Sequence, residues 1–387
     1  MKTVGIICEY NPIHLGHKKQ IDRIRSEFGD DTAIICAMSG NFVQRGSPAI
    51  VDKTARARAA VNCGADLVLE LPVTTALSSA EGFAAGGVRM LAPVCDVLCF
   101  GAETAEKERL LSAARALLKP EFSALLREEL ETGTSFPAAR EAALKRMDVD
   151  ASVLSQPNDI LAVEYCKAIL SQKVSMEIFP IYRQGSYHAL SVDADNPSAT
   201  AVRNLMLIAH NWKSCVPQAA RPVLEGDPLH STAAGEKAML SRLRTMSDAE
   251  FEALPYGSEG LWRKLMRACR QENTLEEILA ATKSKRYTRS RLDRMVMCAF
   301  LGITAEDMDA SVPYTRVLAF SSRGRSVLKE AKKTGLYLNA GESSDHPYWQ
   351  LEKRCGDLYG LFCTEGVEAP GREENRRIYY EITGEIN

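Results

Sequence analysis

Residues 4–17 have the sequence VGIICEYNPIHLGH, and this stretch decides the fold. The apolar run over residues 4–8 predicts a buried parallel strand, and the tetrad HLGH at residues 14–17 opens a segment with helical periodicity. The turn between them lies at the carboxyl end of the strand, where α/β folds place ligands, and the free N–H groups of the following helix attract phosphate. Gly16 lets a ligand approach the backbone between two histidines that share one side of the turn. The stretch therefore predicts a phosphate site with added side-chain donors.

The tetrad resembles the HxGH signature of the nucleotidyltransferase superfamily, whose members act at the α-phosphate of ATP. Two other interpretations of so short a motif stay open at this point. One is a helix-capping turn with a solvent-exposed pair of histidines. The other is a metal site, because histidines at positions i and i+3 can bind zinc.

Apolar runs alternate with helical segments along the next 180 residues. We predict strands over residues 32–38, 66–70, 96–100 and 175–182, and helices over residues 53–63, 78–91 and 160–171. Asp52 is a plausible N-cap, and Pro120 and Pro137 stand where two further helices should begin. Strand and helix at this regular spacing favour a doubly wound α/β domain.

Candidate site residues follow the predicted strands. Gly101 comes at the end of one strand, where a missing side chain lets a base or ribose approach, although a glycine there also suits a plain turn. Arg183 directly follows another strand and suits a phosphate or carboxylate, with a surface salt bridge as the alternative. In the loop over residues 39–49, any chemistry belongs to Gln44 and Arg45.

A second phosphate-like helix start lies further along the chain. Ser198 is predicted to cap a helix that runs to about His210, so that hydroxyls and backbone N–H groups gather at one end. Arg203 lies one turn into this helix and can reach the same anion with two N–H groups. Capping explains Ser198 alone, but it does not explain why Thr200 and Arg203 follow it.

Composition bounds the rest of the chain. Its 387 residues suffice for two domains, and 45% hydrophobic and 25% charged residues are ordinary for a globular protein. The formal net charge of −2 means that any binding of nucleic acid needs a local basic patch. Residues 283–294 hold six basic residues in twelve, and RNA phosphates are their natural partner, with a solvated helix face as the alternative. The six are Lys283, Lys285, Arg286, Arg289, Arg291 and Arg294.

Composition also bears on the compartment. Glu9 interrupts the first apolar run, so the amino terminus does not resemble a secretion signal, and no apolar stretch is as long as a membrane span. The eleven cysteines include no CxxC pair and are predicted to be small buried hydrophobic residues. A cytoplasmic protein is therefore expected.

Seven stretches together resemble the tRNA(Met) cytidine acetate ligase family. They are EYNPIHLGH, SGNFVQRGSPA, DLVLELP, FGAE, PNDILAVEY, SATAVR and KRYTRSRLDR. Ile13 stands where the family usually has an aromatic residue. The resemblance implies a Rossmann-like nucleotidyltransferase domain of the HIGH type over residues 1–216, with a parallel sheet between two helical faces. A mainly helical tRNA-binding region would then occupy residues 217–387.

The resemblance further implies a two-step reaction. Acetate and ATP would give acetyl-adenylate, and the wobble cytidine of elongator tRNA(Met) would then accept the acetyl group as N(4)-acetylcytidine. His14, His17, Ser198, Thr200 and Arg203 would serve catalysis. ATP would be bound by Ile7, Cys8, Glu9, Tyr10, Asn11, Pro12, Ile13, His14, Leu15, Gly16, His17, Lys18, Lys19, Gln20, Gly101, Asn158 and Arg183.

Mg²⁺ is expected with the phosphates of ATP, but no carboxylate cluster in the sequence marks a metal site on the protein. Neither a membrane nor a stable protein partner is implied. Two other functions remain open at this stage. One is an adenylyltransferase that acts on a small phosphorylated metabolite, and the other is a nucleotide-responsive RNA-binding protein without catalysis.

Overall fold

The computed structural model describes the chain except residues 184–196, 311–314, 335–346 and 382–387. Within the described residues, the central sheet has seven strands in the order β7-β6-β1-β2-β5-β8-β9. The first five in this order are parallel, β8 is antiparallel to β5, and β9 is parallel to β8. Their bounds are β1 Thr3–Cys8, β2 Ala33–Ser39, β5 Leu67–Leu71, β6 Val97–Ala102, β7 Glu177–Tyr182, β8 Val317–Ser321 and β9 Tyr379–Glu381.

The connectivity of this sheet places the candidate site. From β1 the chain builds β2 and β5 on one side, and it then crosses to build β6 and β7 on the other. The carboxyl ends of β1 and β6 therefore mark the topological switch point, where open parallel sheets bind their ligands. The HLGH tetrad follows β1, and Gly101 lies near the end of β6.

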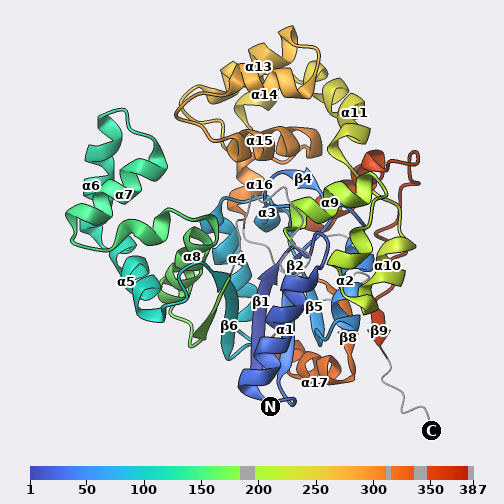
Figure 1. The fold of residues 1–387 in the computed structure, drawn as a ribbon. Helices are drawn as coiled ribbons and strands as arrows, with labels where there is room; N and C mark the ends of the chain where they lie inside the picture. Colours follow the sequence, from blue (N-terminus) through green and yellow to red (C-terminus); the bar gives the residue numbers. More distant parts are fainter. Residues whose placement is uncertain (184–196, 311–314, 335–346, 382–387) are drawn as a thin grey trace.

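Helices cover both faces of the sheet, as predicted (Figure 1). Ile21 and Ile24 of α1 pack on one face beside α2, α9 and α10, whereas Phe83 of α4 packs on the other beside α5, α8 and α17. The bounds of these helices are α1 Leu15–Phe28, α2 Lys53–Asn62, α4 Ala80–Leu91, α5 Lys107–Leu117, α8 Pro157–Gln172, α9 Ala199–Leu207, α10 Arg221–Glu225 and α17 Ser322–Ala331. Helices α6 (Pro120–Glu131) and α7 (Phe136–Arg146) project from this body, and each has proline in its first turn, as predicted.

A third core lies above the carboxyl end of the sheet. It is built by α11 (Thr232–Thr245), α13 (Leu261–Gln271), α14 (Leu275–Thr282), α15 (Arg289–Leu301) and α18 (Pro347–Tyr359), with short helices α12 (Asp248–Glu252) and α16 (Ala305–Asp309) beside them. Phe42 from the hairpin of β3 (Phe42–Val43) and β4 (Ser47–Pro48) inserts into this core, as does Val73 from α3 (Val73–Ala76). Trp349 and Tyr359 of α18 are buried.

The last third of the chain contributes strands as well as helices. Strands β8 and β9 return to the first sheet and extend it beyond β5. Sequence periodicity marks a strand but does not say which sheet it joins, because that choice depends on distant partners. The division at residue 217 itself stays a prediction.

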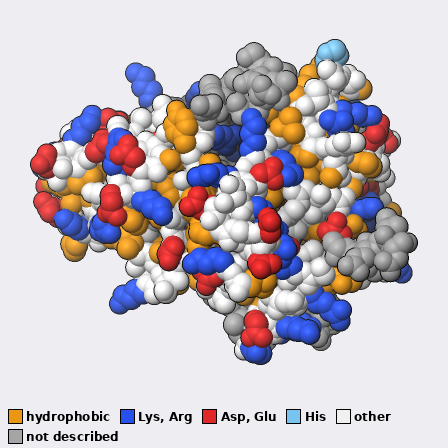
Figure 2. All heavy atoms as spheres, turned by 60° about the horizontal axis from the view of Figure 1, so that its bottom comes forward, with side chains coloured by type: hydrophobic (Ala, Val, Ile, Leu, Met, Phe, Trp, Pro, Cys, Tyr) orange, Lys and Arg blue, Asp and Glu red, His pale blue; other side chains and the backbone are white. Residues whose placement is uncertain are grey.

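Two further features concern burial and surface. All eleven cysteines are buried and free of disulfides, which confirms the prediction for them. The described residues contain no helix with the length and apolar character needed to cross a bilayer. Figure 2 shows the molecule with the lower side of Figure 1 turned forward, and charges of both signs are interspersed over this face. Such mixing agrees with the small net charge of the chain.

We predict that Gly46 is required for the contact between the β3–β4 hairpin and α15. Its φ is +78°, and a Cβ atom there would lie 2.4 Å from the backbone nitrogen of Arg294. Gly133 has a similar φ of +83° but no atom within 4 Å of the added Cβ. Gly133→Ala should therefore cost only about 1–2 kcal/mol for the left-handed backbone. Gly46→Ala should cost roughly 1–3 kcal/mol more because backbone atoms must separate. Urea unfolding of both variants measures the difference, and equal losses would contradict the prediction.

Candidate nucleotide-binding site

The HLGH tetrad forms the turn between β1 and α1, with His14 as the N-cap of the helix. The N–H of Gly16 donates to His14 Nδ1 at 3.1 Å, and the N–H of His14 donates to His17 Nδ1 at 3.2 Å. Both Nδ1 atoms are thus acceptors, so each neutral ring carries its proton on Nε2. The rings stack with their centroids 3.6 Å apart. The turn therefore holds two N–H donors in fixed orientations.

Burial keeps these two rings neutral. His14 is 2% exposed, and its Nε2 has no hydrogen-bond partner among the described residues. Burial, reinforced by Arg183 and Arg203, lowers the pKa of His14 to about 3. Burial, followed by His14 and Arg183, lowers the pKa of His17 well below its usual value. At neutral pH both imidazoles are therefore donors without charge, and positive charge near them comes from the arginines.

Helix α9 brings the second predicted group to this turn. Arg203 Nη1 donates to the carbonyl of Asn11 at 2.8 Å, although 192 positions separate the two residues, and its Nη2 donates to Thr200 Oγ1 at 3.0 Å. Ser198 caps α9 by accepting the N–H of Ala201 at 3.1 Å, as predicted. The structure thus brings the histidines, Thr200 and Arg203 together at one end of the sheet.

A third group approaches from β6, β7 and α8. Arg183 Nη1 donates to Asn158 Oδ1 at 3.4 Å, and Asn158 Nδ2 donates to Glu103 Oε1 at 2.6 Å. The other oxygen of Glu103 accepts the N–H of Asp159 at 2.9 Å. A Cβ atom on Gly101 would meet only Arg183 within 4 Å, at 3.8 Å. Gly101, Asn158 and Arg183 therefore lie together, and Glu103, which the sequence analysis did not select, connects them.

The remaining residues of the predicted ATP segment have mixed environments. Ile7, Cys8, Tyr10 and Ile13 pack in the two cores of the sheet. Gln20 reaches the carbonyl of Cys99 at 3.5 Å. Lys18 pairs with Asp22 on the surface of α1. Several members of the segment thus support the turn from within the fold.

Comparisons with known proteins identify the family of this chain. A family model described as HIGH Nucleotidyl Transferase matches residues 1–374. The tRNA(Met) cytidine acetate ligase of Acetivibrio thermocellus is 35% identical over 358 residues, which cover 86% of each chain. That of Clostridium novyi is 35% identical over 380 residues, which cover 93% of each chain.

The chain belongs to the tRNA(Met) cytidine acetate ligase family. This confirms the predicted family, the nucleotidyltransferase fold and the enzyme class of ligase. The crystal structure of apo TmcAL from Thermotoga maritima has a TM-score of 0.91 and 30% identity, and the match covers 99% of this chain and 100% of that one. The same protein bound with alpha-thio ATP has a TM-score of 0.88. This second match also covers 99% of this chain and 100% of that one. The Thermotoga maritima protein therefore binds an ATP analogue within the shared fold.

In this member of the tRNA(Met) cytidine acetate ligase family, a buried arginine fixes the strand ends beside the turn. Arg56 of α2 is fully buried and donates to the carbonyls of Glu9 at 2.6 Å and Ser39 at 3.1 Å, and also to those of Gly40 and Val51. Burial lowers the pKa of its guanidinium. The sequence predicts Arg56 only as one residue of a helix over residues 53–63, because its carbonyl partners lie in other segments.

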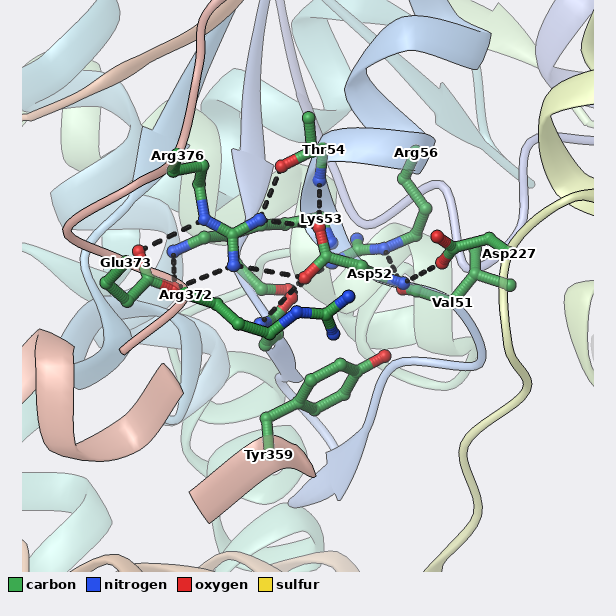
Figure 3. Close-up of polar contacts among 12 residues, drawn as sticks. Val51, Asp52, Lys53, Thr54, Arg56, Asp227, Tyr359, Arg372, Glu373 and Arg376 are labelled. Atoms are coloured by element: carbon green, nitrogen blue, oxygen red, sulfur yellow. Dashed lines mark hydrogen bonds and ion pairs between the residues drawn. The ribbon is translucent and has the colours of Figure 1, made fainter. Parts of the chain in front are cut away.

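Figure 3 shows a second buried polar cluster at the start of the same helix. Arg376 contacts both carboxylate oxygens of Asp52, at 2.6 and 3.1 Å, and Glu373 Oε1 at 2.9 Å. Lys53 Nζ lies 2.9 Å from Glu373 Oε1 and 2.6 Å from Glu70 Oε1. Asp52 caps α2 as predicted, but its ion pair with a residue 324 positions later left no local signal.

The predicted RNA-binding run spans the end of α14 and the start of α15. Arg286 pairs with Glu259 at 2.8 Å, and Arg289 pairs with Glu276 at 2.7 Å. Arg294 is 8% exposed, and its guanidinium lies 5.1 Å from the ring centre of Tyr256. Arg294 therefore points inward against the hairpin region, while Arg286 and Arg289 remain on the surface with acidic partners.

No protein metal site for Mg²⁺ is evident beside the tetrad among the described residues. Two carboxylates at the ends of β1 and β6 already have hydrogen-bond partners: Glu9 accepts the N–H of Gln44 at 2.9 Å, and Glu103 holds Asn158 and Asp159. Such a donor set fits an ion that arrives on nucleotide phosphates better than one held in a protein cage.

We predict that the histidine turn makes the fold less stable in mild acid. A histidine whose pKa is lower in the folded state binds more protons when the chain is unfolded. The free energy of unfolding therefore decreases as the pH drops below about 6.5, the pKa of histidine in the unfolded chain. For His14 the slope approaches about 1.4 kcal/mol per pH unit below pH 6.5. The lowered pKa values of Asp52 and Glu373 add to acid sensitivity only below about pH 4.5.

His14→Asn keeps an acceptor at the N-cap and removes the titrating ring. Urea unfolding between pH 7.5 and pH 5 should therefore give a flatter pH dependence for this variant than for the wild type. Parallel curves for the two proteins would refute the assignment of the neutral ring.

Proposed function

We propose that this chain joins acetate to ATP and passes the acetyl group to the wobble cytidine of elongator tRNA(Met). In the first step, a carboxylate oxygen of acetate attacks the α-phosphorus, and the bond to pyrophosphate breaks. In the second, the exocyclic amine of cytidine attacks the acetyl carbonyl, AMP leaves with the bonding electron pair, and the amine releases one proton. The product is N(4)-acetylcytidine. Because the substrate is a tRNA, the enzyme acts in the cytoplasm.

The convergence of two neutral N–H donors with two arginines carries this proposal. Charge that develops on the phosphates and on departing pyrophosphate needs donors that are oriented beforehand, and the His14 and His17 Nε2–H groups meet that need. Arg203, held by Asn11 and Thr200, supplies positive charge from α9. No covalent enzyme intermediate is required, because acetate itself is the nucleophile.

The remaining predicted residues take supporting roles in the proposal. Asn158 hydrogen-bonds the nucleotide, Arg183 binds phosphate, and Gly101 leaves space beside them. Ser198 and Thr200 close over the phosphates from the start of α9. Mg²⁺ comes with ATP and neutralises phosphate charge, while acetate lies against the α-phosphate. Residues 1–216 carry the ATP chemistry, and the helices after residue 217 bind tRNA.

The decisive experiment is mass spectrometry of nucleosides from tRNA(Met) that has been incubated with the protein, ATP and acetate. We expect N(4)-acetylcytidine together with AMP. Exchange of pyrophosphate into ATP should need acetate and should not need tRNA. If exchange instead requires a small phosphorylated metabolite, and cytidine stays unmodified, the adenylyltransferase function replaces this proposal.

We predict that the two imidazole donors act in adenylate formation. His14→Asn and His17→Asn should each lower acetate-dependent pyrophosphate exchange by roughly 100-fold or more, the usual cost of one lost transition-state donor. Arg23→Ala, which removes an exposed pair with Glu27 on the same helix, is the matched control and should retain full exchange. Wild-type exchange rates in either histidine variant, with circular dichroism showing a normal fold, would contradict the assignment.

We predict that the exposed arginines of the basic run act only on tRNA. Arg286→Glu combined with Arg289→Glu should raise the KM for tRNA about tenfold or more, because phosphate contacts are lost and repulsion is added. The KM values for ATP and acetate should not change. Pyrophosphate exchange without tRNA should stay at the wild-type rate. The control is Arg127→Glu on the projecting helix α6, an exposed position outside the run. An equal KM change in the control would show a nonspecific charge effect.

A further inference from the structure

Three potential metal ligands meet where residues 227–231 run beside residues 360–368. His230 and Cys363 form an antiparallel bridge, and the N–H of Glu368 donates to the carbonyl of Gly360 at 3.2 Å. The ligand atoms of His230, Cys363 and Glu368 lie within 4.8 Å of one another. The side chain of His230 is fully buried, and that of Glu368 is 11% exposed. Cys363 is buried and free of disulfides.

The hydrogen bonds of His230 leave one ring nitrogen as a ligand. Its Nδ1 lies 3.1 Å from the carbonyl oxygen of Pro228, which only accepts, so Nδ1 carries a proton. In the neutral ring, Nε2 then carries a lone pair, and this atom lies 3.0 Å from Glu368 Oε2. Two acceptors at this distance need a cation or a further proton between them. A histidine fixed through Nδ1 to a backbone carbonyl is also the usual orientation of a metal-bound imidazole.

The surroundings hold these groups in place. The ring of Tyr359 stacks on His230 with a centroid distance of 4.0 Å, and Arg372 pairs with Glu368 Oε2 at 2.5 Å. Asp227 and Arg372 both line an adjoining cavity of about 400 Å³.

We propose that His230, Cys363 and Glu368 bind one zinc-type divalent cation, separate from the nucleotide site. Nitrogen, sulfur and carboxylate oxygen form a donor set that suits Zn²⁺, with bonds of about 2.0–2.3 Å. Such bonds put neighbouring ligand atoms roughly 3.3–3.8 Å apart, so shifts of about 1 Å from the present separations close the site. Binding releases the thiol proton of Cys363 to solvent.

The cation acts as a clip between two distant segments. Residues 227–231 lead into α11, and residues 360–368 lead to Glu373 and Arg376 of the buried cluster in Figure 3. Closing the clip therefore fixes the segment that supplies ion partners to Asp52 and Lys53. This role is structural and does not depend on the reaction proposed above.

The test uses the whole chain, which is dialysed against a buffer that contains a zinc salt and is then desalted to remove unbound metal. Elemental analysis should find about one equivalent of zinc per chain, and Co²⁺ in its place should give a thiolate-to-metal charge-transfer band. Cys363→Ala should lose both signals. Cys269→Ala, which removes a buried thiol from α13, is the matched control and should keep both. Added zinc should raise the melting temperature of the wild type and of the control only.

A second measurement covers the case in which Cys363→Ala does not fold. In the wild type, zinc should slow the reaction of Cys363 with a thiol reagent, as read by peptide mass spectrometry, and should leave Cys63 unchanged. Zinc content well below one equivalent, equal retention by the two alanine variants, or no protection of Cys363 would each overturn the proposal. The contact would then be a simple ion pair between His230 and Glu368.

Discussion

The structure depends on a fully buried guanidinium. Arg56 lies near the start of α2 and donates to carbonyl groups at the ends of β1 and β2, those of Glu9 and Ser39. A buried cation of this kind is stable only when oxygen dipoles surround it, so the carbonyls of Glu9, Ser39, Gly40 and Val51 must stay where they are. The loop after β1 holds the histidine turn, and the loop after β2 holds the β3–β4 hairpin. One side chain thus sets the distance between the loop that follows β1 and the loop that follows β2.

Charge and hydrogen bonding are divided between different residues at the histidine turn. Burial is the main reason that the imidazoles are neutral, because it lowers the pKa of both rings, and Arg183 lowers both further. Their Nδ1 atoms accept hydrogen bonds from backbone N–H groups. They contribute direction, whereas Arg183 and Arg203 contribute charge. Arginines remain cationic in such surroundings when histidines do not, since the guanidinium pKa is far higher. A polyanion therefore meets a site whose charge does not vary over the physiological pH range.

The local parts of this arrangement could be predicted from the sequence, and the long-range parts could not. The strand, turn and helix around His14 have a periodicity and a spacing that are visible within fifteen residues, and the cap at Ser198 follows from one residue type at one position. Arg56, Glu103 and the pair of Asp52 with Arg376 gave no such signal, because an ion pair across 324 positions leaves each partner in an ordinary local sequence. Arg294 was read as part of a basic surface because its neighbours are basic, yet it is buried against Tyr256. The place of β8 in the sheet depends on its pairing with β5, a segment about 250 positions earlier in the chain, which local periodicity does not reveal.

The loop between β2 and α2 explains why the two parts of the chain have one relative orientation. Phe42 belongs to the core of the helical region, while Ile50 and Val51, only eight and nine positions later, belong to the core of the sheet. Tyr359 of α18 donates to the carbonyl of Ala49 at 2.9 Å, between these two anchor points. A loop that is buried in both cores cannot follow a movement of one core without leaving the other. Any such shift would expose apolar surface on one side or open a void on the other. The geometry between the sheet and the helices above its carboxyl end is therefore fixed by packing rather than by the length of a linker.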